Sequence, residues 1–139
     1  MKATEFIRPR YPHMRGDEAS IWTKFLTQTA LEFDRVVYDL HLGEGQPLVP
    51  GEEPYIADLK QAVTRKRVDA VGENPETIWI FEVKPRVSMG SLGQLLSYYE
   101  LYIKEYPTTK YVMLGAIGER KEPDLDGIFQ LHAINIFLV

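Results

Sequence analysis

Residues 67–84 read RVDAVGENPETIWIFEVK, and this stretch organises the rest of the chain. Two apolar runs flank segment 72–76, Gly-Glu-Asn-Pro-Glu, whose composition is typical of a turn. The pattern predicts a β-hairpin whose first strand carries Asp69 and whose second strand ends near Lys84. Asp69, Glu82 and Lys84 are therefore expected at the same end of the hairpin.

The second strand of this hairpin is predicted to have two different faces. Because successive strand side chains point to opposite faces, Glu82 and Lys84 share a face with Ile78 and Ile80. Two acids at one place repel each other unless a cation lies between them, and Mg²⁺ prefers oxygen ligands. The alternative interpretation is that Glu82 and Lys84 are the solvated end of the strand.

A helix is predicted after the break at residues 85–90, with Ser91 as its capping residue. Gln94 and Tyr98 are four residues apart, so they are neighbours on the face that adjoins the buried stripe. The buried stripe itself is predicted to contain Leu92, Leu95, Leu96, Tyr99, Tyr102 and Ile103.

Asp69, Glu82-x-Lys84 and Gln94-x-x-x-Tyr98 together resemble the D…(D/E)xK and QxxxY motifs of the PD-(D/E)xK nuclease superfamily, in its RecB-like branch. The resemblance covers nearly the whole chain. It implies an α/β fold with a restriction-endonuclease-like three-layer core, in which a mixed β-sheet is flanked by helices. It also implies a metal-dependent deoxyribonuclease that hydrolyses phosphodiester bonds in nucleic-acid processing or repair, a role compatible with a phage or mobile-element source.

The resemblance further implies an ion site for Mg²⁺ or Mn²⁺. Asp69 and Glu82 would ligate the ion, together with the Val83 carbonyl and Glu18 of the first helix. For Glu18 the alternative is a side chain that only favours the helix dipole.

The same resemblance assigns catalytic roles to three further residues. Lys84 would orient the attacking water and stabilise the phosphate. Gln94 and Tyr98 would position that phosphate or the water.

The remaining chain completes an α/β pattern within one domain, 1–139, in which residues 1–16 are expected to form an extended arm. Segment 54–64 is predicted as either a short helix or an extended arm. Asp39 is interpreted as an outward-facing polar residue rather than a further ligand. The other predicted elements are a helix from Asp17, strands over 33–42, 110–117 and 135–139, and a helix over 125–133.

Composition limits the possible classes of function. The 139 residues include no cysteine, which excludes disulfides, thiolate zinc sites and a cysteine nucleophile. His13, His41 and His132 lack a metal-ligand spacing and are expected on the surface or in loops. Without a long apolar run or a signal peptide, we expect a cytoplasmic protein with no membrane partner.

The expected partner is DNA, with a homodimer or a larger nucleic-acid-processing complex as the assembly. A net charge of −4 argues against nonspecific coating of nucleic acid. The alternative function is a catalytically inactive nuclease-fold protein that acts as a binding or assembly module. Basic residues that form either a phosphate-guiding rim or solvated charge are Arg8, Arg10, Arg15, Lys60, Arg65, Lys66, Arg67 and Arg86.

Overall fold

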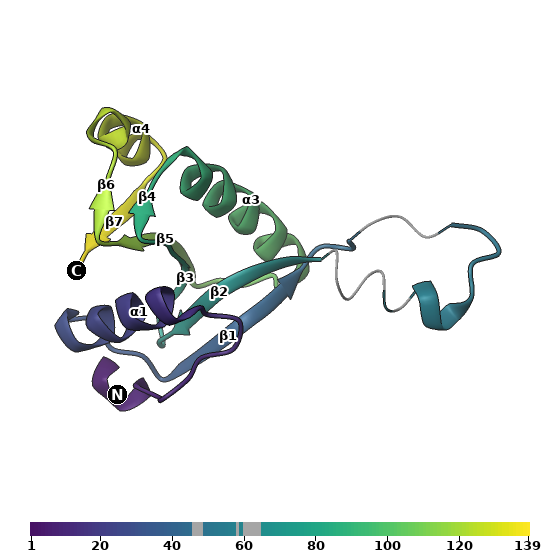
Figure 1. Cartoon of the computed structure of the whole chain (residues 1–139), viewed down its shortest axis with the longest axis horizontal. Helices are drawn as coiled ribbons and strands as arrows, with labels where there is room; N and C mark the ends of the chain where they lie inside the picture. Colours follow the sequence, from purple (N-terminus) through teal and green to yellow (C-terminus); the bar gives the residue numbers. More distant parts are fainter. Residues whose placement is uncertain (46–48, 58, 60–64) are drawn as a thin grey trace.

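The computed structural model describes residues 1–45, 49–57, 59 and 65–139. Its centre is a mixed five-stranded sheet in the order β1-β2-β3-β5-β7, with helices on both faces (Figure 1). The strands are β1 (Arg35–Leu42), β2 (Lys66–Glu73), β3 (Thr77–Val83), β5 (Tyr111–Gly118) and β7 (Ile134–Leu138). The helices are α1 (Gly16–Gln28), α3 (Met89–Glu105) and α4 (Asp126–Leu131), with 3-10 turns η1 (Ala3–Phe6) and η2 (Pro123–Leu125).

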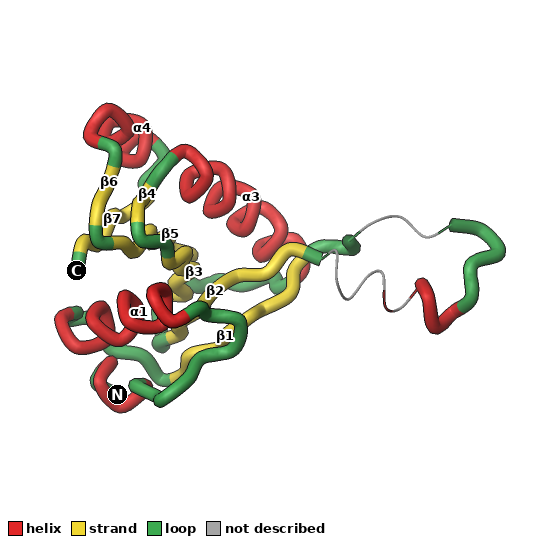
Figure 2. Tube along the Cα trace, in the orientation of Figure 1, coloured by secondary structure: helices red, strands yellow, loops and turns green. Residues whose placement is uncertain are grey.

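The predicted hairpin and the predicted mixed sheet are both confirmed. Strands β2 and β3 pair antiparallel, whereas β5 pairs parallel with β3 and with β7. Strand β2 extends to Glu73, so the turn is shorter than predicted and covers residues 74–76. A second, two-stranded sheet that the sequence did not predict joins β4 (Arg86–Val87) to β6 (Arg120–Lys121), as Figure 2 shows.

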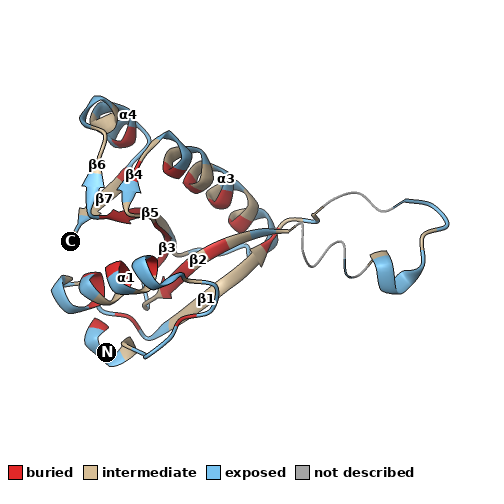
Figure 3. Ribbon diagram, in the orientation of Figure 1, coloured by how far each residue is buried: buried red, intermediate tan, exposed pale blue. Residues whose placement is uncertain are grey.

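Two hydrophobic cores lie on opposite faces of the sheet (Figure 3). The core under α1 is rich in aromatic rings, among them Trp22, Phe25 and Phe81, which are almost completely buried. The core under α3 contains Ile78 and Ile80, which confirms the predicted faces of β3. Truncating a buried ring such as Phe81 to alanine costs about 3–5 kcal/mol, so these cores hold the inner strands β2 and β3 firmly in place.

At the level of Asp39, the side chains of β1 and β2 change the face of the sheet toward which they point. Tyr38 and Ala70 pack under α1, whereas Leu40 and Val68 pack under α3, although the pairs Tyr38↔Ala70 and Leu40↔Val68 keep one register. Strict alternation would put these positions of each strand on one face. Asp39 adopts a left-handed backbone with φ 52°, which is uncommon outside glycine and least unfavourable for Asp and Asn. Asp39 is therefore not an ordinary outward-facing residue of a regular strand.

The prediction of an extended arm over residues 1–16 is wrong in part. Residues Ala3–Phe6 form a 3-10 turn, and Ala3 and Tyr11 are buried. The Tyr11 hydroxyl lies 2.8 Å from Thr23 Oγ1 and so ties this segment to α1. Because these contacts join residues far apart in sequence, local composition did not reveal them.

Two further predictions concern connecting segments. Residues 54–57 are helical, in agreement with the helix alternative for 54–64, while residues 58 and 60–64, including Lys60, lie outside the described residues.

Ser88, not Ser91, is the N-cap of α3. In the part of the chain that the structure describes, no helix is long and apolar enough to span a bilayer.

Candidate active site

The candidate active site lies where the two strands of the hairpin separate. The β2–β3 pairing ends at Ala70↔Phe81, and the next two residues along that register are Asp69 and Glu82. Asp69 Oδ2 accepts a hydrogen bond of 2.8 Å from the Val83 N–H, so a side chain replaces the backbone carbonyl of a regular ladder. Because the N–H and C=O of one strand residue leave on the same edge, the Val83 carbonyl also faces β2.

Glu82 is a buried carboxyl with an incomplete set of partners. Its exposed fraction is 2%, and no donor in the described residues reaches its Oε2 atom. Burial, followed by the charge of Asp69, raises the pKa of Glu82 to about 9. Burial also raises the pKa of Asp69, against the opposing effect of the Val83 hydrogen bond. The fold therefore opposes the ionisation of both acids together when no cation is bound.

Lys84 extends from the end of β3 into the same region. Its Nζ atom lies 3.5 Å from Glu18 Oε2 and 3.7 Å from Glu82 Oε1. Burial alone would lower the pKa of Lys84, but the carboxyls of Glu82, Glu18 and Asp69 outweigh burial and raise it. Lys84 is thus a half-exposed ammonium at neutral pH.

The backbone of Lys84 is fixed by β5. Its N–H donates to the Ile117 carbonyl at 3.0 Å. A Cβ atom on Gly118 would lie only 2.7 Å from the Lys84 carbonyl oxygen, which is too close for any side chain. Gly118 therefore permits the close approach that holds the lysine in place.

Glu18 lies both at the start of a helix and beside the site. It lies in the first turn of α1, where its Oε1 accepts the Arg15 N–H at 3.2 Å, while its Oε2 faces Lys84. The side chain therefore stabilises the start of the helix and also borders the site.

Gln94, which lies on α3, contacts Glu82. In the orientation that gives its amide complementary neighbours, the nitrogen donates to Glu82 Oε1 and to the Gly90 carbonyl, each at 3.2 Å. The same amide lies 3.5 Å from the Tyr98 hydroxyl. Gln94 therefore fixes one oxygen of Glu82.

Tyr98 lies on the buried stripe of α3 rather than beside it, which corrects the predicted position. It is 5% exposed and packs in the core that contains Leu95 and Tyr102. Burial, followed by the charges of Glu82 and Asp69, raises the pKa of its hydroxyl. Tyr98 is therefore a neutral, covered side chain that contacts Gln94.

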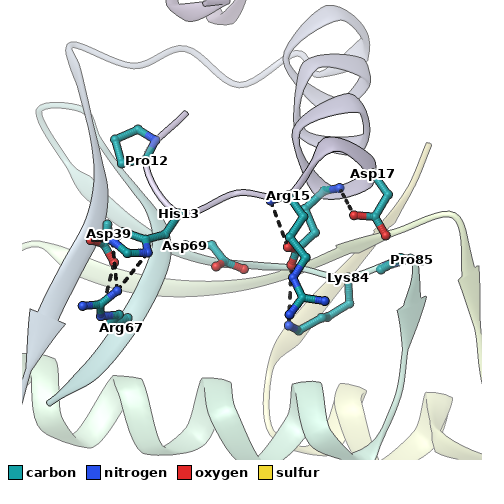
Figure 4. Close-up of a pocket in the computed structure, with 10 residues that line it drawn as sticks. Pro12, His13, Arg15, Asp17, Asp39, Arg67, Asp69, Lys84 and Pro85 are labelled. Carbon is teal, nitrogen blue, oxygen red and sulfur yellow. Dashed lines mark hydrogen bonds and ion pairs between the residues drawn. The ribbon is translucent and has the colours of Figure 1, made fainter. Parts of the chain in front are cut away.

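A cavity of about 390 Å³ is lined by Glu18, Asp69 and Lys84, among others, whereas Glu82 lies buried behind it. Figure 4 shows Asp69 between Lys84 on one side and His13, Asp39 and Arg67 on the other. Of these three, Arg67 was expected in a phosphate-guiding rim or as solvated charge and Asp39 as an outward-facing residue rather than a further ligand, whereas His13 was not connected to the site. Arg67 precedes Asp69 by two positions on one strand, a spacing that indicated a shared face, whereas nothing in the sequence signalled His13.

The oxygen atoms at the open strand end fit a hard divalent cation. Asp69, Glu82 and the Val83 carbonyl offer only oxygen donors, which Mg²⁺ and Mn²⁺ prefer. A cation there would relieve the repulsion between the acids and give Glu82 Oε2 a partner. Within the described residues, no group of three or more His, Cys, Asp or Glu side chains is arranged to hold a metal ion.

Comparisons with known proteins add no relative to this description. No protein-family model, curated protein or solved structure matches the chain significantly. The chemistry and geometry of the open strand end are therefore the basis for a function.

Proposed function

We propose that the chain is a Mg²⁺- or Mn²⁺-dependent deoxyribonuclease of the PD-(D/E)xK type, with a restriction-endonuclease-like core. The observation that carries the proposal is the meeting of Asp69, Glu82 and Lys84 at one separated strand end beside a cavity. Two acids that resist ionisation together and an adjacent ammonium suit a cation and a phosphate better than they suit a stable strand end.

Each residue of the site has a distinct part in this reaction. A divalent cation held by Asp69, Glu82 and the Val83 carbonyl would offset phosphate charge and acidify a water molecule. Glu82 would give up its proton on binding the cation, because metal ligands must be deprotonated. Gln94 holds the Oε1 atom of Glu82 and so fixes the carboxylate plane.

Lys84 supplies the positive charge that faces the substrate. Its ammonium is half-exposed, so a phosphate oxygen can reach it, and it is already oriented by Glu18 and Glu82. A fixed charge of this kind stabilises the growing negative charge without reorganising during the reaction. Glu18, which borders the cavity, would complete the oxygen set around the ion while it holds Lys84.

The proposed setting is nucleic-acid processing or repair in the cytoplasm, with DNA as substrate. Assembly as a homodimer or within a larger nucleic-acid-processing complex stays a prediction.

The test is cleavage of labelled single-stranded, duplex, flapped and four-way-junction DNA in Mg²⁺, in Mn²⁺ and in EDTA. Asp69→Asn is the matched control, because an asparagine oxygen can still accept the Val83 N–H while the negative charge is lost. We expect strand cleavage by the unaltered protein only when metal is present, and none by Asp69→Asn. Absence of cleavage together with absence of metal binding by calorimetry would instead support the inactive binding or assembly module.

A further inference from the structure

Two arginines near the start of β2 have very different surroundings. Arg65 is fully engaged: its Nη2 lies 3.0 Å from both Glu105 carboxylate oxygens and 2.9 Å from the His41 carbonyl. Its Nε donates to the Gly43 carbonyl at 2.6 Å. These contacts are those of an arginine that joins segments of the fold.

Arg67 lacks comparable acceptors. Its Nη1 lies 2.8 Å and 2.9 Å from the two ring nitrogens of His13. In the part of the chain that the structure describes, the nearest carboxylate oxygen is Asp39 Oδ1, 3.9 Å from Arg67 Nε. The guanidinium thus faces a basic ring, and its charge is only weakly neutralised.

Asp39 holds the two histidines around this arginine. Its Oδ2 atom lies 3.1 Å from His13 Nε2 and 3.3 Å from His41 Nε2. Asp39 and His13 both have left-handed backbones, with φ 52° and 57°. Such strained conformations persist only where the surroundings fix them, and they gather at binding sites. The surroundings therefore hold the Arg67 and His13 side chains in place at one end of the cavity.

We propose that Arg67 and His13 form a phosphate subsite, which binds a phosphodiester of the DNA strand next to the one that is cut. This inference rests on the proposed nuclease function. Arg67 and Asp69 line one cavity and are two residues apart on one strand, a separation of about 6.6 Å. That separation is of the same order as one nucleotide of a DNA strand.

The charges favour an anion over a second cation at this place. A guanidinium within 4 Å of Asp39 opposes the approach of a divalent ion. Its planar fork of donors matches phosphate oxygens, and a phosphate would supply charged acceptors where Arg67 has, among the described residues, only the His13 ring nitrogens and Asp39 Oδ1 at 3.9 Å. His13, with its side chain 58% exposed, lines the same end of the cavity and lies within reach of an anion bound there.

The experiment maps which phosphate each residue contacts. Single-stranded DNA is prepared with one uncharged methylphosphonate at each linkage in turn, and binding is measured by fluorescence anisotropy in Ca²⁺, which also takes oxygen ligands. Strand cleavage is followed separately in Mg²⁺ to locate the cut. Arg67→Ala and Arg67→Gln are compared with Arg35→Ala, which removes an equal charge from an exposed ion pair with Glu73, outside the cavity lining.

We expect the unaltered protein to lose affinity when one linkage beside the cut is neutral. The Arg67 variants should bind the fully charged strand about tenfold more weakly and should be indifferent to that same linkage. Their plot of log affinity against log salt should be shallower by about 0.7 for a single strand. Arg35→Ala should keep the sensitivity of the unaltered protein.

The outcomes separate this subsite from the nuclease itself. Identical linkage profiles for the unaltered protein and both Arg67 variants would overturn the subsite, as would absence of DNA binding by the unaltered protein. Linkage-specific coupling to Arg67 without cleavage in any metal would support the subsite and contradict the nuclease. A purely structural role for Arg67 would weaken all strands equally and would also overturn the proposal.

Discussion

The acidic residues at the two ends of the β2–β3 hairpin have opposite electrostatic surroundings. At the turn, Glu73 lies 2.7 Å from Lys110 Nζ and 2.9 Å from Arg35 Nη2, and the Lys110 hydrogen bond, opposed only in part by burial, lowers its pKa. At the open end, Glu82 lies beside another acid, and its pKa rises to about 9. The same pair of strands therefore holds one glutamate whose negative charge is balanced by a lysine and an arginine, and one whose ionisation the fold opposes.

Under the proposed function, this difference distinguishes groups that stabilise the fold from groups that would bind a cation. Side chains at the turn complete their interactions within the protein, as when Asn74 Oδ1 accepts from the Thr77 N–H at 2.8 Å. Glu82 keeps an oxygen without a donor inside the described structure. Buried polar groups are nearly always satisfied in folded proteins, so an exception of this kind points to a missing partner.

The largest expected effect comes from making the same change at both ends. Glu82→Gln should abolish metal-dependent cleavage, because a neutral amide is a poor ligand for a hard cation. Glu73→Gln should leave the cleavage rate unchanged and lower the free energy of unfolding by about 1 kcal/mol, the size of a surface ion pair. Cleavage rates and urea unfolding of both variants measure this contrast, and equal loss of cleavage in both would contradict it.

A second expected effect concerns the charge that faces the substrate. Lys84→Ala should lower kcat by about 10²–10³-fold and should change DNA binding much less. The measurement is a comparison of kcat with Kd. If binding collapses while the rate per bound complex is unchanged, Lys84 has been given the wrong role.

A smaller effect is expected from the residue that holds Glu82. Gln94→Ala removes the donor to Glu82 Oε1 and should weaken metal binding by about 10–100-fold, as for other groups that orient metal ligands. Calorimetric titration with Mn²⁺ measures this loss. The control is Ser97→Ala, because Ser97 is exposed on α3 and its hydroxyl donates only to the Gly93 carbonyl within the described residues. This variant should bind Mn²⁺ normally.

The smallest effect is on the stability of the metal-free protein. The folded pKa of Glu82 is raised from 4.5 to about 9, so its favourable contribution is complete below pH 4.5 and is lost as pH rises toward 9. Glu82→Gln does not titrate and should become the more stable protein as pH increases. A tenfold change in proton affinity equals ~1.4 kcal/mol, so we expect at least this gain near pH 8. Thermal unfolding in EDTA across about pH 5 to 9 measures it, and parallel curves would contradict it.

The open end of the hairpin was largely predictable from the sequence, whereas the pairing of Glu73 with Lys110 and Arg35 at the other end was not. Alternation of Ile78, Trp79, Ile80 and Phe81 fixed the two faces of β3, and the charged residues after them marked its end. Local periodicity carries this information because a strand side chain can take only one of two directions.

The sequence did not predict features that depend on contacts across the fold. The left-handed Asp39 and His13 meet only after β1 and the N-terminal segment pack together. Tyr98 was placed beside the buried stripe, because helical spacing does not say how widely a neighbouring sheet covers a helix. Ser88 and Ser91 are both suitable caps, and only the path of the chain after β4 selects Ser88.

Gly118 has a consequence for how this protein can vary. It lies 34 positions beyond Lys84, outside the motif that the sequence displays, yet a Cβ there would press on the Lys84 carbonyl at 2.7 Å and on Val87 at 3.0 Å. Any substitution at Gly118 would therefore shift the lysine while leaving every motif residue intact. A chain can therefore keep Asp69, Glu82 and Lys84 in its sequence and still lose the positions that these side chains need. The presence of the motif residues alone does not establish that the site is intact.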